Sequence, residues 1–164
     1  MKRILIVAGS LALAGSLVAC NPSSEFGKIS VGVSNVLKGA DNALARLAAE
    51  VHSVECIPVL ADLASKRLAA QGCTNVTVHR GDGSLGWPPA APYDAIVVTA
   101  AGPEVPAALK AQLKLGGRLV MPVGERHGPQ DLLRLTRNSE HGEQRELLLP
   151  VRFVPLTGAQ GWPG

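Results

Sequence analysis

The stretch YDAIVVT at residues 93–99 is a run of apolar and β-branched residues that follows Pro92 and leads into Gly102-Pro103. Such a run is typical of a strand that a parallel sheet buries on both faces. Parallel strands need crossover connections, which are usually helices. The stretch therefore predicts an α/β fold.

The segments on either side of this run alternate between strand and helix patterns. Further strands are predicted at residues 51–55, 75–79, 118–123 and 151–156. Helices are predicted at residues 41–50, 58–72 and 104–113, with Pro58 in a first turn, Gly72 just past a helix end, and Gly116-Gly117 ending the last of them. Residues 132–136 and 146–149 flank a polar turn and predict a hairpin. The sheet is thus expected to be mostly parallel, with antiparallel strands at its C-terminal end.

The composition narrows the functional classes. The 164 residues are 46% hydrophobic but only 3% aromatic, which predicts an aliphatic core, and three cysteines are too few for a disulfide scaffold. The net charge of +3 is spread thinly, with no Lys/Arg run longer than two residues. We therefore expect neither nucleic-acid binding nor a metal site, since the four histidines share no ligand spacing and read as structural or surface residues.

The first twenty residues support two interpretations. Lys2-Arg3 precedes an uncharged apolar stretch, and Leu17-Val18-Ala19-Cys20 resembles a bacterial lipobox, so we favour a lipoprotein signal at residues 1–19 with Cys20 lipidated. A polar tether at residues 20–42 would follow. In the alternative, residues 2–9 form the first buried strand of the sheet and lead into a turn that contains Gly9.

Polar and small residues follow three of the predicted strands. In open α/β sheets, ligands bind beyond the carboxyl ends of the strands. Glu55 ends one strand and can accept hydrogen bonds from two ribose hydroxyls, while Asp82 and Gly83 follow the next and suit an exocyclic amine. Residues 99–103 follow the third and offer small side chains and a hydroxyl. Together they predict a nucleoside-like ligand.

Residues 43–158 resemble protein-L-isoaspartate O-methyltransferases. The likeness covers about 115 residues in order. The matching stretches are LARLAAEVHSVE at 44–55, GDGSLGWP at 81–88, PYDAIVVTAA at 92–101, PEVP at 103–106, GGRLVMPVG at 116–124 and PVRFVPLTG at 150–158.

The resemblance implies a Rossmann-like class I methyltransferase that uses S-adenosylmethionine to methylate the free carboxylate of isoaspartyl residues in damaged proteins. It implies that Glu55 holds the ribose, and Asp82 with Gly83 the adenine. The residues that would line the substrate cleft are Thr99, Ala100, Ala101, Val154 and Pro155. It implies a cytoplasmic monomer, and no catalytic residue is assigned.

The chain departs from the family pattern before residue 43. Counting back without gaps places the glycine-rich cofactor loop on Ser34, Val36 and Lys38, and no serine lies in the family's active-site context. The methyltransferase domain at residues 43–164 is therefore expected to be partial, with residues 29–33 as a possible substitute for its first strand. If the leader is used, the chain is periplasmic or membrane-anchored. The alternative function is then a lipid-anchored envelope protein with an inactive methyltransferase-like domain.

Overall fold

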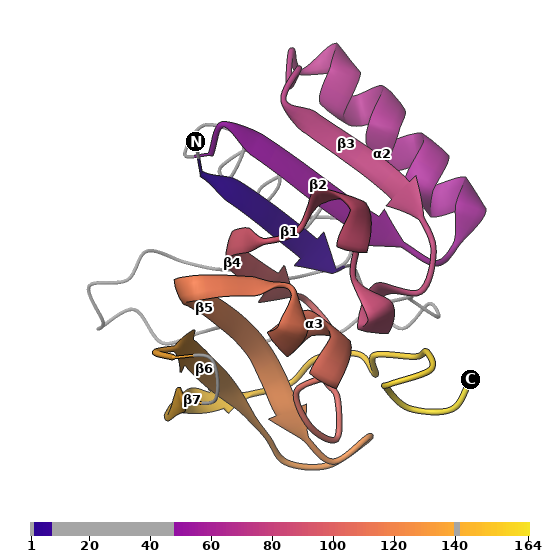
Figure 1. Cartoon of the computed structure of the whole chain (residues 1–164). Helices are drawn as coiled ribbons and strands as arrows, with labels where there is room; N and C mark the ends of the chain where they lie inside the picture. Colours follow the sequence, from indigo (N-terminus) through magenta and orange to yellow (C-terminus); the bar gives the residue numbers. More distant parts are fainter. Residues whose placement is uncertain (1, 8–47, 140–141) are drawn as a thin grey trace, which may run out of the picture.

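The computed structural model describes residues 2–7, 48–139 and 142–164. Within these residues, seven strands form one sheet in the order β3-β2-β1-β4-β5-β6-β7 (Figure 1). β1 to β5 are parallel, and β6 and β7 run antiparallel to their neighbours. The elements are β1 (Arg3–Val7), β2 (Glu50–Glu55), α2 (Pro58–Ala70), β3 (Val76–Arg80), η1 (Gly83–Leu85), η2 (Pro88–Ala90), β4 (Tyr93–Val98), α3 (Ala107–Ala111), β5 (Leu113–Gly124), β6 (Gln130–Arg137) and β7 (Glu143–Val151). The predicted fold class, mostly parallel with antiparallel C-terminal strands, is confirmed.

The middle one of the five parallel strands is β1, which the sequence analysis favoured as part of a leader. β1 pairs with β2 from Arg3 to Val7 and with β4 from Ile4 to Val7. The strands predicted around Val51 and Tyr93 therefore flank a first strand, and that strand is the one given by the alternative interpretation. The substitute strand predicted at residues 29–33, the glycine-loop positions and Cys20 all lie outside the described residues.

Side chains of β1 alternate between the two faces of the sheet and so join two separate cores. Leu5 and Val7 are fully buried in a large cluster that continues into β4, β5 and α3. Ile4 and Ile6 belong to a smaller cluster with Val51. Because neighbouring side chains of a strand point to opposite faces, a strand that is buried on both faces requires an unbroken apolar run, which β1 has at residues 4–7.

The helix predicted from Pro58 is confirmed as α2, with proline in its first turn and Gly72 just past its end at a φ of 72°. The amide of Gly72 donates to the Ala69 carbonyl, and that of Cys73 to the Leu68 carbonyl. This pair of bonds is the Schellman arrangement, which satisfies carbonyls that the helix end leaves open. α2 packs against β2 and β3 (Figure 1).

The third predicted helix is wrong at both ends. α3 covers only Ala107–Ala111, and β5 begins two residues later at Leu113. The partner of Tyr93 is Leu113, whereas that of Ala95 is Arg118, so the register shifts where Gly116 and Gly117 lie. These glycines lie inside β5, where its register with β4 shifts, instead of ending a helix. Glycine marks a break in either structure, and the sequence alone does not say which.

The predicted hairpin is confirmed by β6 and β7, whereas the predicted last strand at residues 151–156 is wrong. β7 ends at Val151, and the chain then leaves the sheet edge and returns to pair at Pro155 with Ala101. The helix predicted at residues 41–50 lies mostly outside the described residues, and Glu50 at its end belongs to β2. None of the described helices is long and apolar enough to cross a membrane.

Candidate active site

The carboxyl ends of β1 to β4 lie side by side along one edge of the sheet. Val7 is level with Val54 of β2 and Val98 of β4, and Glu55 is level with Arg80 of β3. The segments that follow these strands therefore meet at one edge. All the predicted cofactor and substrate residues of the described chain belong to these segments or to the returning C-terminal segment.

Glu55 ends β2 and is 6% exposed. Its Oε1 accepts a hydrogen bond from the Ile57 amide at 2.9 Å, which fixes the carboxylate just ahead of α2. A buried carboxylate is costly unless it is hydrogen-bonded. Among the described residues its second oxygen, Oε2, accepts no hydrogen bond, so it is available to a ligand's hydroxyls.

Asp82 caps the single turn η1 and holds it through its side chain. Oδ1 accepts from the Ser84 amide at 2.8 Å and from the Ser84 hydroxyl at 2.7 Å. Oδ2 accepts from the Ala159 amide at 2.7 Å. Gly83, beside it, is buried in η1. The structure thus puts Asp82 and Gly83 at the edge that the sequence predicts, and adds a contact with the C-terminal segment.

The five residues predicted to line the substrate cleft also meet at this edge. Ala101 and Pro155 form a β-bridge, with the Ala101 amide donating to the Val154 carbonyl at 2.8 Å. Ala100 and Ala101 are fully buried. The Thr99 hydroxyl, which the sequence analysis expected to face the cleft, donates instead to the Val7 carbonyl at 3.2 Å and ties β4 to the end of β1.

Gln112 is a residue of this region that sequence reasoning missed. It follows α3, is 6% exposed, and its Oε1 accepts from the Trp87 amide at 2.8 Å. Its Nε2 donates to the carbonyls of Leu85 at 2.8 Å and Ala108 at 3.0 Å. One amide side chain thereby holds the loop after η1. Nothing in the local sequence signals this, because Trp87 and Leu85 lie 25 and 27 residues away along the chain.

The sequence analysis treated His52 and His79 as separate structural residues, whereas the structure bonds them to each other. Nδ1 of His52 and Nε2 of His79 are 2.9 Å apart, and His79 stacks on Trp87 with ring centroids 3.8 Å apart. Nε2 of His52 is within 3.1 Å of Glu50 Oε1, although their geometry is not that of a hydrogen bond. Burial and the neighbouring His52 lower the pKa of His79.

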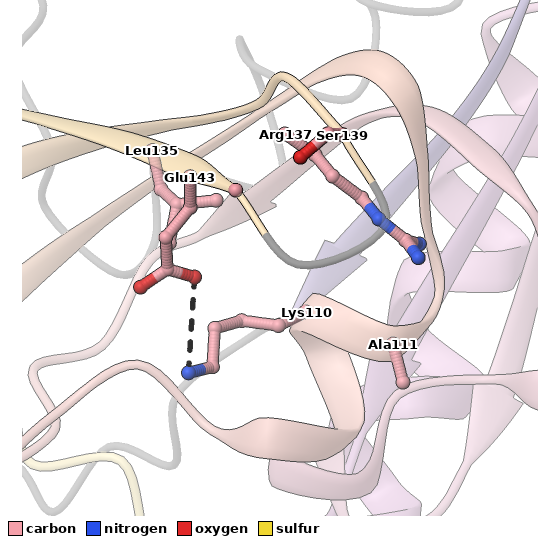
Figure 2. Close-up of a pocket in the computed structure, with 7 residues that line it drawn as sticks. Lys110, Ala111, Leu135, Arg137, Ser139 and Glu143 are labelled. Carbon is pink, nitrogen blue, oxygen red and sulfur yellow. Dashed lines mark ion pairs between the residues drawn. The ribbon is translucent and has the colours of Figure 1, made fainter.

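A cavity on the described surface lies at the opposite edge of the sheet. It is lined by Lys110, Ala111, Leu135, Arg137, Ser139, Gly142 and Glu143. Figure 2 shows Lys110 reaching Glu143, whose carboxylate is 3.8 Å from Nζ. The cavity sits where β6 ends and β7 begins, next to the start of β5, so it contains none of the residues predicted to bind cofactor or substrate.

A mostly parallel α/β sheet, with a buried acid at the end of β2 and a capped acid–glycine turn after β3, places this chain in the class of open α/β sheet domains, which bind ligands beyond the carboxyl ends of their strands. Residues 39–161 match the family model described as Protein-L-isoaspartate(D-aspartate) O-methyltransferase (PCMT). The chain belongs to this family.

Relatives agree with that assignment, and solved structures agree with the fold. Proteins named protein-L-isoaspartate O-methyltransferase from Rhodopseudomonas palustris are 54% identical over 140 residues and 58% identical over 119, covering 77% and 73% of this chain. The chain spans only 64% and 49% of their length. A solved protein-L-isoaspartate O-methyltransferase superposes with a TM-score of 0.75 at 24% identity, over 98% of this chain and 43% of that one. A second, from Plasmodium falciparum in complex with S-adenosyl-L-homocysteine, gives 0.60 at 20%, over 95% and 66%, and both support the fold.

Proposed function

We propose that this chain binds S-adenosylmethionine and transfers its methyl group to the free carboxylate of isoaspartyl residues in damaged proteins. The observation that carries the proposal is the convergence at one sheet edge. Glu55, Asp82 with Gly83, and the Ala101–Pro155 bridge come from distant parts of a chain of the isoaspartate methyltransferase family and meet beyond the carboxyl ends of β1 to β4.

The residues present fit a nucleoside. Oε2 of Glu55 is available to ribose hydroxyls. The Asp82 carboxylate has about four acceptor positions, of which three are used by Ser84 and Ala159. The remaining position, on Oδ2, suits the exocyclic amine of an adenine. Gly83 beside it has no side chain to obstruct the approach of a base.

When bound, S-adenosylmethionine supplies a methyl group on a sulfonium, which passes to a carboxylate oxygen as the carbon–sulfur bond breaks, without any proton transfer. The chain's residues then have to bind and orient two reactants, and such positioning can account for several kcal/mol of a barrier, roughly 7–11 in well-oriented systems. Glu55 and Asp82 would fix the nucleoside end, while Pro155, held in place by its bridge to the buried Ala101, would position the peptide at the neighbouring strand end.

Calorimetric titration of the full chain with S-adenosylmethionine tests the proposal. We expect micromolar affinity that is lost in Asp82→Ala and weakened in Glu55→Gln, with Asp131→Ala on β6 as a control. Methyl transfer to a peptide with one isoaspartyl residue, and none to the same peptide with aspartate, is the second expected result. No binding at millimolar cofactor would overturn the proposal.

A second candidate function rests on Leu17-Val18-Ala19-Cys20: a lipid-anchored envelope protein whose methyltransferase-like body is inactive. Cleavage before Cys20 would remove Arg3–Val7, the strand that β2 and β4 share, so the processed chain would have to rebuild the centre of its sheet. This favours the uncleaved chain, which we propose acts as a cytoplasmic monomer. In a bacterial host, a mobility shift on inhibiting signal peptidase II, abolished in Cys20→Ser, would support the anchored form instead.

A further inference from the structure

The C-terminal segment at residues 157–160 contacts the predicted nucleoside loop, residues 82–84, which contains the predicted adenine-binding Asp82 and Gly83. The Ala159 amide donates to Asp82 Oδ2 at 2.7 Å, and the next amide, of Gln160, donates to the Ser84 hydroxyl oxygen at 3.0 Å. That hydroxyl in turn donates to Asp82 Oδ1 at 2.7 Å. Ser84 is fully buried, whereas the bond from Ala159 to Asp82 lies at the exposed surface.

The close approach of the two segments depends on Gly158. A Cβ at this position would lie 2.1 Å from Asp82 Oδ1 and 2.7 Å from the Ser84 hydroxyl oxygen. Its φ of 151° is also one that side chains with a Cβ rarely adopt. A side chain here would push the segment away from Asp82, so the contact is built into the sequence.

The same segment is fixed to the residues predicted to line the substrate cleft. The Leu156 amide donates to the Ala101 carbonyl at 2.8 Å, and the Trp162 amide donates to the Leu156 carbonyl at 2.7 Å. Gln160 Oε1 accepts from the Ala108 amide at 3.0 Å, just inside α3. Residues 154–160 are therefore bound at one end to the strand-end loop after β4 and at the other to the loop after β3.

We propose that Asp82 and Ser84 join the predicted nucleoside loop to residues 154–160, so that the two segments move as one unit. A nucleoside bound at one end of this unit and a peptide bound at the other then strengthen each other's binding. The inference rests on the proposed function for the identity of the two ligands. Asp82 Oδ2 is the connecting atom, because it accepts from Ala159 and retains one position for an exocyclic amine. Ser84 acts as a positioning residue, since it contacts Asp82 and Gln160 but neither ligand.

Amide hydrogen exchange in the ligand-free chain tests the tie itself. We expect the Gln160 and Leu156 amides to be protected, and Ser84→Ala to lower the protection of both at least tenfold, because local opening of one part then releases the other. Ser65→Ala is the matched control, since Ser65 lies on α2 and its hydroxyl donates only within that helix. Unchanged protection of these amides in Ser84→Ala would overturn the proposal.

The coupling between ligands is measured by titrating S-adenosylhomocysteine with and without an isoaspartyl peptide. In the unchanged chain the peptide should tighten nucleoside binding about fivefold or more, the lower end of common coupling energies. Ser84→Ala and Gly158→Ala should reduce that ratio to below about twofold while Ser65→Ala keeps it. An equal ratio in all variants would overturn the coupling. Absence of any S-adenosylhomocysteine binding in the unchanged chain would instead overturn the proposed function, and the exchange experiment would still decide whether the tie exists.

Discussion

β1 and β7 both contain runs of large aliphatic side chains, but the run of β1 is buried and that of β7 is exposed. β1 pairs on both sides, and Leu5 and Val7 are fully buried. β7 is the last strand of the sheet, and Leu147 is 64% exposed. The aliphatic runs at residues 4–7 and 147–149 contain the same kind of side chain, so it is the place of each strand in the sheet order that decides whether its run is buried. The stability of the fold should therefore depend strongly on residues 3–7 and weakly on residues 147–149.

The largest effect is expected from Leu5→Ala. The substitution leaves a cavity in a cluster that spans β1, β4 and β5, and such changes destabilise by about 2–5 kcal/mol. Urea unfolding followed by circular dichroism at neutral pH measures it. A change below about 0.5 kcal/mol, the usual range for surface sites, would show that β1 is not the central strand in solution.

The sequence predicted β2, β3, β4, β6 and β7 because each carries its own period and its own turn signals. It predicted β1 only as the alternative to a leader, because a leader and a strand buried on both faces are both uncharged apolar runs. What separates them is the pairing of Ile4 to Val7 with β2 and β4, which local pattern does not contain.

The candidate site shows the same division. Glu55, Asp82 and Ala101 could be predicted, because each follows its own strand and strand ends share an edge. The contacts of Ser84 with Gln160 and of His52 with His79 join residues 76 and 27 positions apart. Such contacts come from the register of the sheet and the return of the C-terminal segment, not from spacing along the chain.

Tyr93→Phe extends the comparison to β4, next to β1. Tyr93 is fully buried and its hydroxyl donates to the Trp87 carbonyl at 2.6 Å. The phenylalanine variant keeps the ring but leaves that carbonyl without its donor, which should cost about 1–3 kcal/mol. Urea unfolding at neutral pH gives the difference, and no loss of stability would contradict the role of this bond.

Tyr93 is also the only tyrosine of the chain, so its ionisation can be followed by phenolate absorbance. Burial raises the pKa of Tyr93 to about 12, with the Glu50 carboxylate adding to the rise and Arg3 opposing it. Because the folded state holds the proton more tightly, its stability should fall as pH rises from about 10, the unfolded value, toward about 12. A native midpoint equal to that in urea would contradict the buried hydroxyl.

His79 lies on β3, the outer strand on the side of the sheet away from β7, where the His79 ring stacks on Trp87. Its pKa is lowered from 6.5, so the folded state binds fewer protons than the unfolded state. Stability from this group is fully present above pH 6.5 and is lost as pH falls below it. The groups around His79 and its partner His52 are the Glu50 carboxylate, which pairs with Arg3, and the Tyr93 ring.

We expect the free energy of unfolding to fall less between pH 7 and 5 in His79→Phe than in the unchanged chain. The phenyl ring can still stack on Trp87 but takes up no proton. His127→Phe, at an exposed position, is the control and should keep the original slope. Parallel pH curves for the unchanged chain and His79→Phe would show that the bonded histidine pair does not affect folding.

The smallest effect is expected from Leu147→Lys on β7. Leu147 is mostly exposed although its strand pairs with β6. Its partner in that pairing, Leu133, is buried in the core and only 7% exposed. Replacing Leu147 removes little buried area, so the free energy of unfolding should change by less than about 0.5 kcal/mol. Charged side chains on an outer strand also discourage pairing with other chains, so the variant should aggregate less on heating. A loss comparable to that of Leu5→Ala would mean that β7 is covered in solution, and light scattering across a dilution series would show whether a second copy covers it.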